Sequence, residues 1–265
     1  MSKRIEDYKK HLPILEIYTA IQSEGSRAGY PTIVIRTTGC THRCFFGEGG
    51  WCDSWYTSIH PEKGQYCFQD IVDMYDKNPY IYEMMLTGGS PTMHPALVNE
   101  LTHFANKRNI VMTMETEGSH FIETDYAIDL LSFSPKFSNS VPTIGTKTPK
   151  GKEVDQKMID QHNKHRLNIK AIAKMIQHNA NFHIKPVFDK ELSIEKEFEQ
   201  FLEDLAEEIS YSLDAVKERV WAMPAGDTRE ALLESYPVVI NYCVKKGYKF
   251  SPRPHIIAFD TERAV

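Results

Sequence analysis

Apolar segments of strand length alternate with segments of helical periodicity along most of the chain. Residues 32–39 read "TIVIRTTG", a strand-like segment that ends in glycine, and residues 81–89 and 110–118 repeat this pattern. Residues 68–78 and 95–109, which lie between these segments, carry apolar side chains at helical spacing. Strands that alternate with helices are typical of parallel βα units.

The second half of the chain continues this alternation after a long polar stretch. A loop is expected at 138–153 and a polar helix at about 153–178, and we interpret 138–178 as an insertion. The remaining segments are the strands 129–136, 181–188, 219–226 and 248–256 and the helices 193–208 and 227–246. Because helices follow strands repeatedly, a barrel is favoured over an open sheet. We predict one α/β domain over residues 1–265, a partial or modified (β/α) barrel with six to seven parallel strands.

Polar, glycine-rich and proline-rich residues follow the predicted strands. A βα barrel carries its chemistry at the C-terminal ends of its strands, so these residues are candidates for a ligand pocket. Similar residues also form ordinary turns, and each group alone is weak evidence for a site. The groups are Gly39-Cys40, Thr87 to Ser90, Glu115 to Gly118, Ser134 to Lys136, Lys185-Pro186 and Met223 to Ala225.

Composition and charge narrow the class of protein. A hydrophobic content of 41% and a charged content of 25% are ordinary for a soluble globular enzyme. The net charge of −5 argues against direct binding of nucleic acid. The basic residues within 147–174 are diluted by acidic ones, which favours a solvated helix face over a phosphate-binding patch. The start has no apolar leader, and no stretch reaches about 18 apolar residues, so we expect a cytoplasmic protein without membrane contact.

Three of the five cysteines lie within thirteen positions, as Cys40, Cys44 and Cys52. Thiols stay reduced in the cytoplasm, so this cluster predicts metal or cofactor ligands rather than disulfides. A catalytic thiol would explain one cysteine but not three. Cys67 and Cys243 stand apart on apparently helical stretches, and we expect both to be small buried residues.

Two kinds of metal group compete for the three clustered cysteines. Structural zinc normally takes four ligands, so it would need His42 or His60 in addition. Iron–sulfur clusters are held by thiolates, and a four-iron cluster on three thiolates leaves one iron free for a second ligand. The position of the cysteines at the end of the first predicted strand favours such a cofactor.

This arrangement resembles the radical S-adenosylmethionine enzymes, which carry Cys-x3-Cys-x2-Cys after the first barrel strand and Gly-Gly-x-Pro after the second. Here "LTGGSP" at 86–91 stands in the corresponding place, while seven residues separate Cys44 from Cys52. Removal of five residues from this glycine-rich stretch would restore the usual spacing, and we interpret 45–49 as an insertion. The resemblance implies a 4Fe-4S cluster on Cys40, Cys44 and Cys52, and S-adenosyl-L-methionine as the second cofactor.

Motifs along nearly the whole chain are similar to one branch of this superfamily, the 7-carboxy-7-deazaguanine synthases. "IQSEG" at 21–25 precedes the first strand, with Ser23 in place of the family's glycine, and Arg36 lies on that strand. "WCDS", "TGGSP", "METEG", "SFSPK" and the tail "RPHIIAFDTERAV" follow in family order. The resemblance implies conversion of 6-carboxy-5,6,7,8-tetrahydropterin to 7-carboxy-7-deazaguanine with loss of ammonia. It also implies that S-adenosylmethionine is regenerated and that Mg2+ assists.

The resemblance further implies a substrate-binding segment at 14–36 and a cluster loop at 39–56. Glu24 suits an N–C–N edge of the pterin, and Arg36 suits its carboxylate. Taken alone, Arg36 is also compatible with a structural ion pair, Glu24 with a surface loop and His255 with a structural role. The implied substrate contacts are Ile21, Gln22, Ser23, Glu24, Arg36, Thr87, His255 and Val265.

The implied cofactor contacts lie mainly at the predicted strand ends. Those to S-adenosylmethionine are Trp51, Cys52, Asp53, Gly89, Ser90, Glu115, Ser134, Pro135 and Lys136, of which Ser90 and Glu115 are chosen by location only. Ser54, two residues past the last cysteine, is the implied Mg2+ ligand, because a hard cation prefers oxygen.

Two other functions remain open at this stage. One is a different radical S-adenosylmethionine enzyme, such as a glycyl-radical activase, which the pterin-edge set Gln22, Glu24 and Arg36 disfavours. The other is a zinc-stabilised binding module without catalysis, which leaves Gly88-Gly89 without a role. For the synthase, the family implies an electron donor such as flavodoxin and a homodimer.

Overall fold

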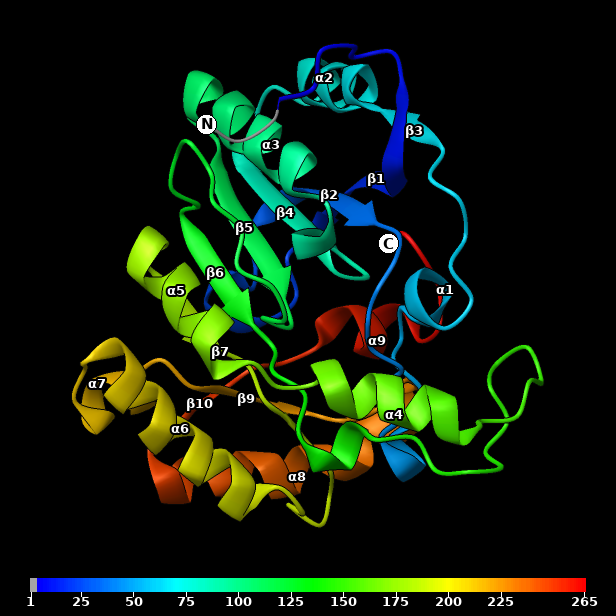
Figure 1. The fold of residues 1–265 in the computed structure, drawn as a ribbon, viewed down its shortest axis with the longest axis vertical. Coiled ribbons are helices and arrows are strands. Elements are labelled where there is room, and N and C mark those ends of the chain that lie inside the picture. The colour runs from blue at the N-terminus through cyan, green and yellow to red at the C-terminus, as the bar shows by residue number, and fades with distance from the viewer. Residues whose placement is uncertain (1–3) are drawn as a thin grey trace.

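The computed structural model describes residues 4–265, and its larger sheet is mostly parallel (Figure 1). The strand order in this sheet is β3-β1-β2-β4-β5-β6-β7. Its strands are β1 (His11–Ile21), β2 (Pro31–Thr37), β3 (Tyr66–Cys67), β4 (Glu83–Gly88), β5 (Val111–Thr116), β6 (Leu130–Phe133) and β7 (Phe182–Ile184). The pairs from β2 through β7 are parallel, whereas β1 pairs antiparallel with β2 and β3.

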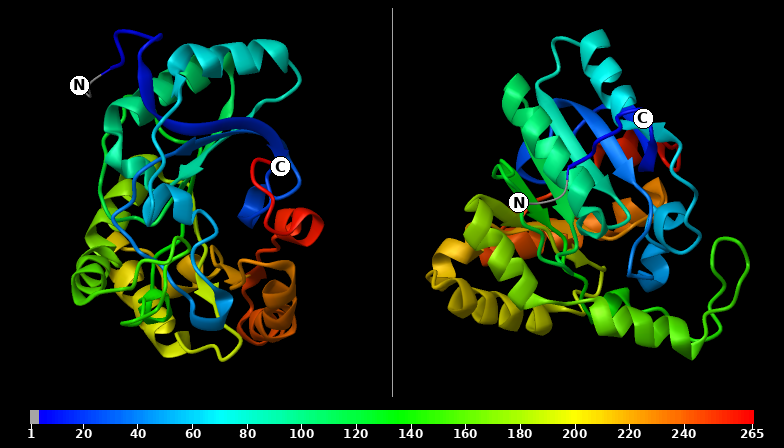
Figure 2. Two further views of the ribbon diagram at one scale, coloured as in Figure 1. Left: turned by 90° about the vertical axis from the view of Figure 1, so that its right-hand side faces the viewer. Right: turned by 45° about the horizontal axis from the view of Figure 1, so that its top comes forward.

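A smaller parallel sheet continues the curve of the larger one. It has the order β10-β9-β8 and comprises β8 (Val187–Phe188), β9 (Trp221–Pro224) and β10 (Lys249–Phe250). A bridge between Ile184 and Val220 joins the two sheets. The two views of Figure 2 show a curved wall of strands that stays open on one side. The predicted α/β fold with a partial barrel is confirmed.

Helices connect the strands, and most of them pack on the outer side of the sheets (Figure 1). The helices are α1 (Trp55–Ser58), α2 (Phe68–Lys77), α3 (Pro95–Arg108), α4 (Gln156–His165), α5 (Ile169–Asn179), α6 (Glu195–Ile209), α7 (Leu213–Lys217), α8 (Arg229–Lys246) and α9 (Pro254–Phe259). Of these, α1 and α9 border a cavity on the inner side. Within residues 4–265, no helix combines the length and the apolar character needed to cross a bilayer.

The residues of β2 explain how the sheet positions a site. Ile33, Val34 and Ile35 are all fully buried, as expected for a parallel strand covered on both faces. Ile33 and Ile35 join the main core beneath the helices. Val34 and Arg36 point to the opposite face, because successive side chains of a strand alternate, and they line a cavity there.

The predicted helix at 153–178 is wrong, because the chain forms two helices there. Asn168 ends the break between them and caps α5, its side-chain oxygen accepting a hydrogen bond from the Ala171 backbone N–H at 3.2 Å. Ile172, Met175 and Ile176 of α5 are buried in the main core. α5 is therefore a regular helix of the barrel, and only the segment before it lies outside the repeating βα units.

Three smaller predictions also differ from the structure. The predicted strand 181–188 is divided into β7 and β8 at Lys185-Pro186, where proline provides no N–H for a ladder. β1 is a long strand that the sequence analysis treated only as part of a binding segment. Cys67 is a partly exposed N-cap of α2, and its backbone N–H donates to Asp70 at 2.7 Å, whereas Cys243 is buried in α8 as expected.

Candidate active site

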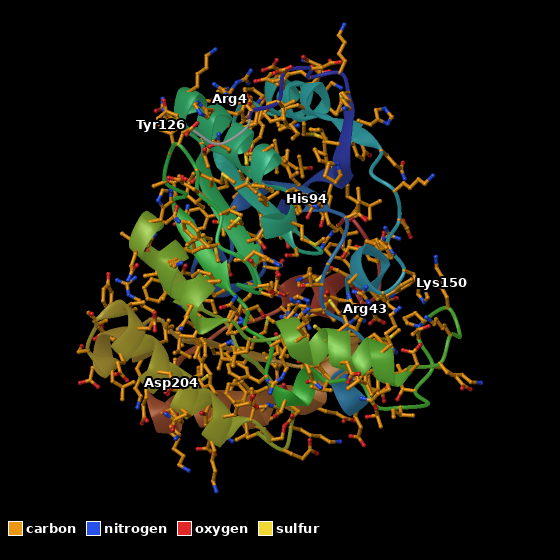
Figure 3. The ribbon with its side chains drawn as sticks, viewed as in Figure 1. Arg4, Arg43, His94, Tyr126, Lys150 and Asp204 are labelled. Atoms are coloured by element: carbon orange, nitrogen blue, oxygen red, sulfur yellow. The ribbon has the colours of Figure 1, made fainter. Side chains whose placement is uncertain are left out.

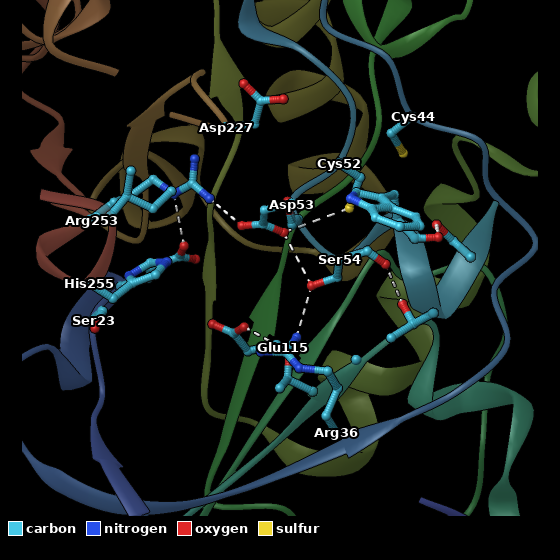
Figure 4. A pocket seen from close by; sticks show the side chains of 18 of the residues that line it. Ser23, Arg36, Cys44, Cys52, Asp53, Ser54, Glu115, Asp227, Arg253 and His255 are labelled. Atoms are coloured by element: carbon cyan, nitrogen blue, oxygen red, sulfur yellow. Dashed lines mark hydrogen bonds and ion pairs between the residues drawn. The ribbon is translucent and has the colours of Figure 1, made fainter. Parts of the chain in front are cut away.

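A cavity of about 500 Å³ opens at the C-terminal ends of the barrel strands (Figure 4). This volume lies within the usual range for small-molecule sites. Strand ends, the cysteine loop and the C-terminal residues 260–265 all contribute to its wall. The side chains that line it are mainly polar or charged where they face one another in Figure 4.

A short hairpin brings Cys44 and Cys52 side by side despite their separation in sequence. Phe45 and Trp51 form an antiparallel bridge, and the Phe46 N–H donates to the Gly50 carbonyl at 2.8 Å. The Cys52 N–H then donates to the Cys44 carbonyl at 3.1 Å. The hairpin tip that this bridge closes spans residues 46–50, one position later than the stretch 45–49 that we interpret as an insertion.

Cys40, Cys44 and Cys52 line the same cavity. Burial raises the pKa of the Cys44 thiol to about 11 and that of Cys52 to about 12, and it raises the pKa of Cys40 well above its usual value. Neighbouring thiols add to the shift for Cys40 and Cys52. Three thiols that border the same cavity fit a cationic group such as an iron–sulfur cluster, whose positive charge would favour their thiolate form.

Arg36 is held in a network at the floor of the cavity. Its Nε donates to Glu16 at 2.8 Å, its Nη2 donates to the Tyr18 hydroxyl at 3.0 Å, and its Nη1 donates to the Ser54 hydroxyl at 2.8 Å. Ser54 in turn donates to Asp53 at 3.2 Å. The structural ion pair considered for Arg36 is therefore present, and the same guanidinium also borders the cavity.

Two cations fix the charge of Glu24 inside the cavity. Lys185, which is 2% exposed, ion-pairs with Glu24 and donates to Glu115 at 2.6 Å. Arg253 donates to Glu24 at 3.1 Å and also ion-pairs with Asp53. Burial alone would raise the pKa of Glu24, but Lys185 and then Arg253 lower it overall, well below its usual value. Glu24 is therefore a carboxylate, which can accept hydrogen bonds from a ligand.

The sequence analysis included Lys185 only among the strand-end candidates for a pocket, without a role, and it missed Arg253 as a member of the site. Lys185 stands at a predicted strand end, and Arg253 stands in the tail beside His255. A basic residue at the C-terminal end of a barrel strand was the available signal for Lys185. Their carboxylate partners lie 70 to 229 positions away in the chain, so no local pattern identifies these ion pairs.

Comparison with known proteins identifies the family. No family model matches the chain. The chain is 31% identical over 247 residues to the 7-carboxy-7-deazaguanine synthase of Halobacterium salinarum, covering 92% of this chain and 89% of that protein. It is 28% identical over 254 residues to the enzyme of the same name from Rhodopirellula baltica, covering 96% and 89%. The chain belongs to the 7-carboxy-7-deazaguanine synthase family.

A solved structure agrees with the fold. The crystal structure of QueE from Escherichia coli superimposes with a TM-score of 0.55 at 20% sequence identity, covering 90% of this chain and 92% of that one. Membership in the synthase family makes the chain an enzyme of the radical S-adenosylmethionine class. The predicted activity is confirmed, as are S-adenosylmethionine and an iron–sulfur cluster as cofactors, and the activase and zinc-module alternatives are not favoured.

Most residues expected in the synthase site face the one cavity. These are Ile21, Ser23, Glu24, Arg36, Cys40, Cys44, Trp51, Cys52, Asp53, Ser54, Thr87, Gly89, Glu115, Ser134, Lys136, His255 and Val265. Gly89 is required by close backbone approach, because a Cβ there would lie 2.0 Å from the Gly39 carbonyl oxygen. The Nδ1 atom of His255 is buried without a hydrogen-bond partner among residues 4–265, which leaves it available to a ligand.

Three expected contacts lie behind the cavity wall. Gln22 is fully buried, and its side-chain amide has no hydrogen-bond partner within the described part of the chain. Ser90 is also fully buried and donates to Glu117 at 2.5 Å. Pro135 is buried between two residues that do line the cavity. These three positions support the wall in this structure rather than forming it.

Proposed function

We propose that this cavity binds 6-carboxy-5,6,7,8-tetrahydropterin and S-adenosylmethionine together during the synthesis of 7-carboxy-7-deazaguanine. The observation that carries the proposal is that three cysteine thiols and the charged set Glu24, Lys185 and Arg253 border the same cavity. This substrate carries a guanidine-like edge on its pterin ring and a carboxylate at position 6, so it needs an anionic and a cationic contact at opposite ends.

Substrate recognition is assigned to side chains from both ends of the chain. Glu24 accepts from the N–C–N edge of the pterin, because Lys185 and Arg253 keep it ionised. Arg36 offers its Nη donors to the substrate carboxylate while Glu16 retains its Nε. His255 contributes its unpaired Nδ1 atom, and Thr87 contributes a hydroxyl that donates to Glu115 at 3.1 Å.

The cofactor side of the cavity is assigned to the cysteine loop and the neighbouring strand ends. Cys40, Cys44 and Cys52 would hold the cluster, which together with S-adenosylmethionine supplies the radical that takes a hydrogen from the substrate. Ser134 and Lys136 line the same side, with the Lys136 Nζ donating to the Ser134 hydroxyl at 2.7 Å.

Mg2+ is proposed to bind at Ser54. The hydroxyl of Ser54 and the carboxylate of Asp53 lie together at the cavity wall, and hard cations prefer such oxygen ligands. The Ser54→Thr variant keeps a hydroxyl, so we expect it to retain Mg2+ stimulation, whereas Ser54→Ala should lose it. Equal stimulation of both variants in steady-state assays with and without Mg2+ would exclude this site.

An acidic one-electron donor such as flavodoxin is proposed as the partner in the cytoplasm. It would dock on the loop 138–153, which lies beside the cysteine loop. Lys147, Lys150 and Lys152 are exposed there, and Figure 3 shows Lys150 projecting from the outer end of the loop. The Trp51 indole N–H donates to the Lys147 carbonyl at 3.1 Å, which ties the loop to the cluster side. Charge attraction predicts that donor-dependent turnover falls steeply with salt, while dithionite-dependent turnover does not.

A homodimer through α8 is proposed as the assembled form. Leu233, Pro237, Ile240 and Val244 are exposed and fall on one face of this helix at spacings of four, three and four. Antiparallel packing of two α8 helices about a two-fold axis would bury this stripe against itself. The same packing would place Glu234 of one copy near Lys245 of the other, because the two flank the stripe at opposite ends of the helix.

The decisive experiment uses anaerobically purified protein reconstituted with iron and sulfide. With dithionite, Mg2+, S-adenosylmethionine and the carboxy-tetrahydropterin, we expect about four irons per chain and formation of the deazaguanine. Cys52→Ser should lose the cluster absorbance and the activity, whereas Cys67→Ser, on a cysteine outside the cavity, should keep both. Cleavage of S-adenosylmethionine without any product from the pterin would refute the substrate assignment.

A further inference from the structure

The C-terminal residues 260–265 form part of the cavity wall. In the left view of Figure 2 this segment lies at the open side of the barrel, beside the β1–β2 end of the sheet. A chain terminus is free to move unless side chains anchor it. The anchor of this segment is Arg263, which follows Thr261 and Glu262.

Arg263 contacts three groups that belong to different parts of the fold. Its Nη2 donates to Glu16 of β1 at 2.8 Å, and its Nε donates to the same carboxylate oxygen at 3.2 Å. Its guanidinium lies 3.4 Å from the centre of the Tyr56 ring. Glu62 lies at the periphery, with contacts of 3.3 and 3.4 Å. The two charge-assisted hydrogen bonds to Glu16 and the contact with the Tyr56 ring hold the C-terminal segment in place.

Glu16 is shared between this anchor and the substrate side of the cavity. Its Oε1 atom accepts from Arg263, and its Oε2 atom accepts from the Nε of Arg36 at 2.8 Å. The carboxylate is only 13% exposed, so each of its bonds is little weakened by water. A single carboxylate thus contacts both the guanidinium of Arg36 and that of Arg263.

We propose that Glu16 is a positioning residue that couples closure of the C-terminal segment to the orientation of Arg36. This inference rests on the proposed function, because it takes Arg36 as the contact to the substrate carboxylate. Seating of Arg263 withdraws one oxygen of Glu16 from water and holds the carboxylate against Arg36. Substrate bound to Arg36 stabilises the same arrangement, so substrate binding and closure favour each other.

The test combines steady-state kinetics with cleavage of the terminus by trypsin, which cuts after Arg263. In the reconstituted enzyme we expect Glu16→Gln to raise the KM for the pterin about tenfold with little change in kcat, the size expected for one lost bond between charged groups. The rate of trypsin cleavage after Arg263 should rise about tenfold as well, and saturating pterin should protect the wild-type terminus. Glu62→Gln removes the peripheral contact and should alter either value less than threefold.

A double-variant cycle separates coupling from independent effects. Arg263→Gln should raise the KM for the pterin about as much as Glu16→Gln does. The double variant should have a KM little higher than that of either single variant, and Arg263→Lys should have a KM between those of Arg263→Gln and wild type. The proposal would be overturned if the KM increases of Glu16→Gln and Arg263→Gln multiply in the double variant. Unchanged trypsin cleavage in Glu16→Gln would also overturn it. Trypsin cleavage can be measured without substrate and without turnover. If the proposed function fails, no product forms, but the cleavage rates of wild type and Glu16→Gln still test whether Glu16 holds the C-terminal segment.

Discussion

At the scale of single residues, the site is organised by buried charges that neutralise one another. Glu24, Glu115 and Asp53 face Lys185 and Arg253, so three acidic and two basic side chains share a small volume. A buried charge without a partner is costly, which explains why each of these carboxylates contacts at least one cation. Removal of one cation therefore affects the whole group.

Arg253 provides the sharpest residue-scale prediction. Arg253→Met removes the contact to both Glu24 and Asp53, and it should lower kcat/KM for the pterin about 100-fold, equivalent to about 3 kcal/mol. Arg253→Lys keeps the charge and should recover part of this loss. Steady-state kinetics and urea unfolding on the reconstituted enzyme check both effects. A kcat/KM value for Arg253→Met within threefold of wild type would contradict the role given to this ion pair.

At the scale of elements, the hairpin at 46–50 explains how an unusual cysteine spacing is compatible with one cluster. The ladder between Phe45 and Trp51 closes the tip, so the two cysteines next to it stay adjacent. Gly50 makes this possible, since it has φ of 77° and a Cβ there would lie 2.0 Å from an Asp227 oxygen. The longer spacing in sequence is therefore taken up by the hairpin tip.

Deletion of residues 46–50 is expected to leave cluster binding intact. The shortened loop would read Cys-Phe-Trp-Cys, and reconstitution should still give about four irons per chain. Stability should fall slightly, because the ion pair between Glu48 and Lys190 is lost with the tip. Iron analysis and visible absorption measure the first effect, with Glu48→Gln as the control for the second. Loss of iron binding in the deletion alone would assign the hairpin a direct part in the cluster site.

Helix α8 carries the element-scale prediction about assembly. Reversal of one charge, in Glu234→Lys, should weaken dimerisation about tenfold, because it places like charges across both symmetric contacts. The further change Lys245→Glu recreates attraction and should restore the dimer. Sedimentation equilibrium measures the dissociation constants. Glu208→Lys on the exposed face of α6 alters net charge equally and serves as control, and equal weakening in that variant would argue against the α8 interface.

At the scale of the whole molecule, His183 links the N-terminal segment to the barrel. Its Nε2 lies 2.7 Å from the Ser132 hydroxyl, and its Nδ1 lies 3.0 Å from the hydroxyl of Ser26. Gly25 packs directly on the ring, where a Cβ would lie 2.4 Å from Cε1. Burial lowers the pKa of His183 to about 3, so the ring is neutral in the folded protein under ordinary conditions.

Stability should therefore depend on pH partly through this histidine. Between about pH 3 and 6.5 the unfolded chain binds a proton at His183 that the folded protein does not, so the free energy of unfolding rises with pH in that window. The contribution is about 1.4 kcal/mol per pH unit. Urea unfolding from pH 4 to 7 should show a smaller slope for His183→Gln than for wild type. The exposed His11→Gln serves as control, and equal slopes in all three proteins would contradict this prediction.

The amino-acid sequence by itself determined the features that depend on local pattern. Strand and helix periodicity identified the βα repeat, because each element must bury an apolar face of its own. The clustered cysteines and the glycines at strand ends predicted a cofactor side, since their chemistry is intrinsic to the residues. Resemblance of whole motifs predicted a substrate segment around Glu24.

Only the tertiary structure decided which distant groups meet. The partners of Glu24 and Glu16, namely Arg253 and Arg263, stand more than 200 positions away, and no periodicity reports such a contact. Packing also decided that α5 belongs to the barrel and that Gln22 lies behind the cavity wall. The physical reason is that burial and charge pairing depend on position in space. The type of a residue limits the chemistry of its side chain, while the fold determines which groups that side chain contacts.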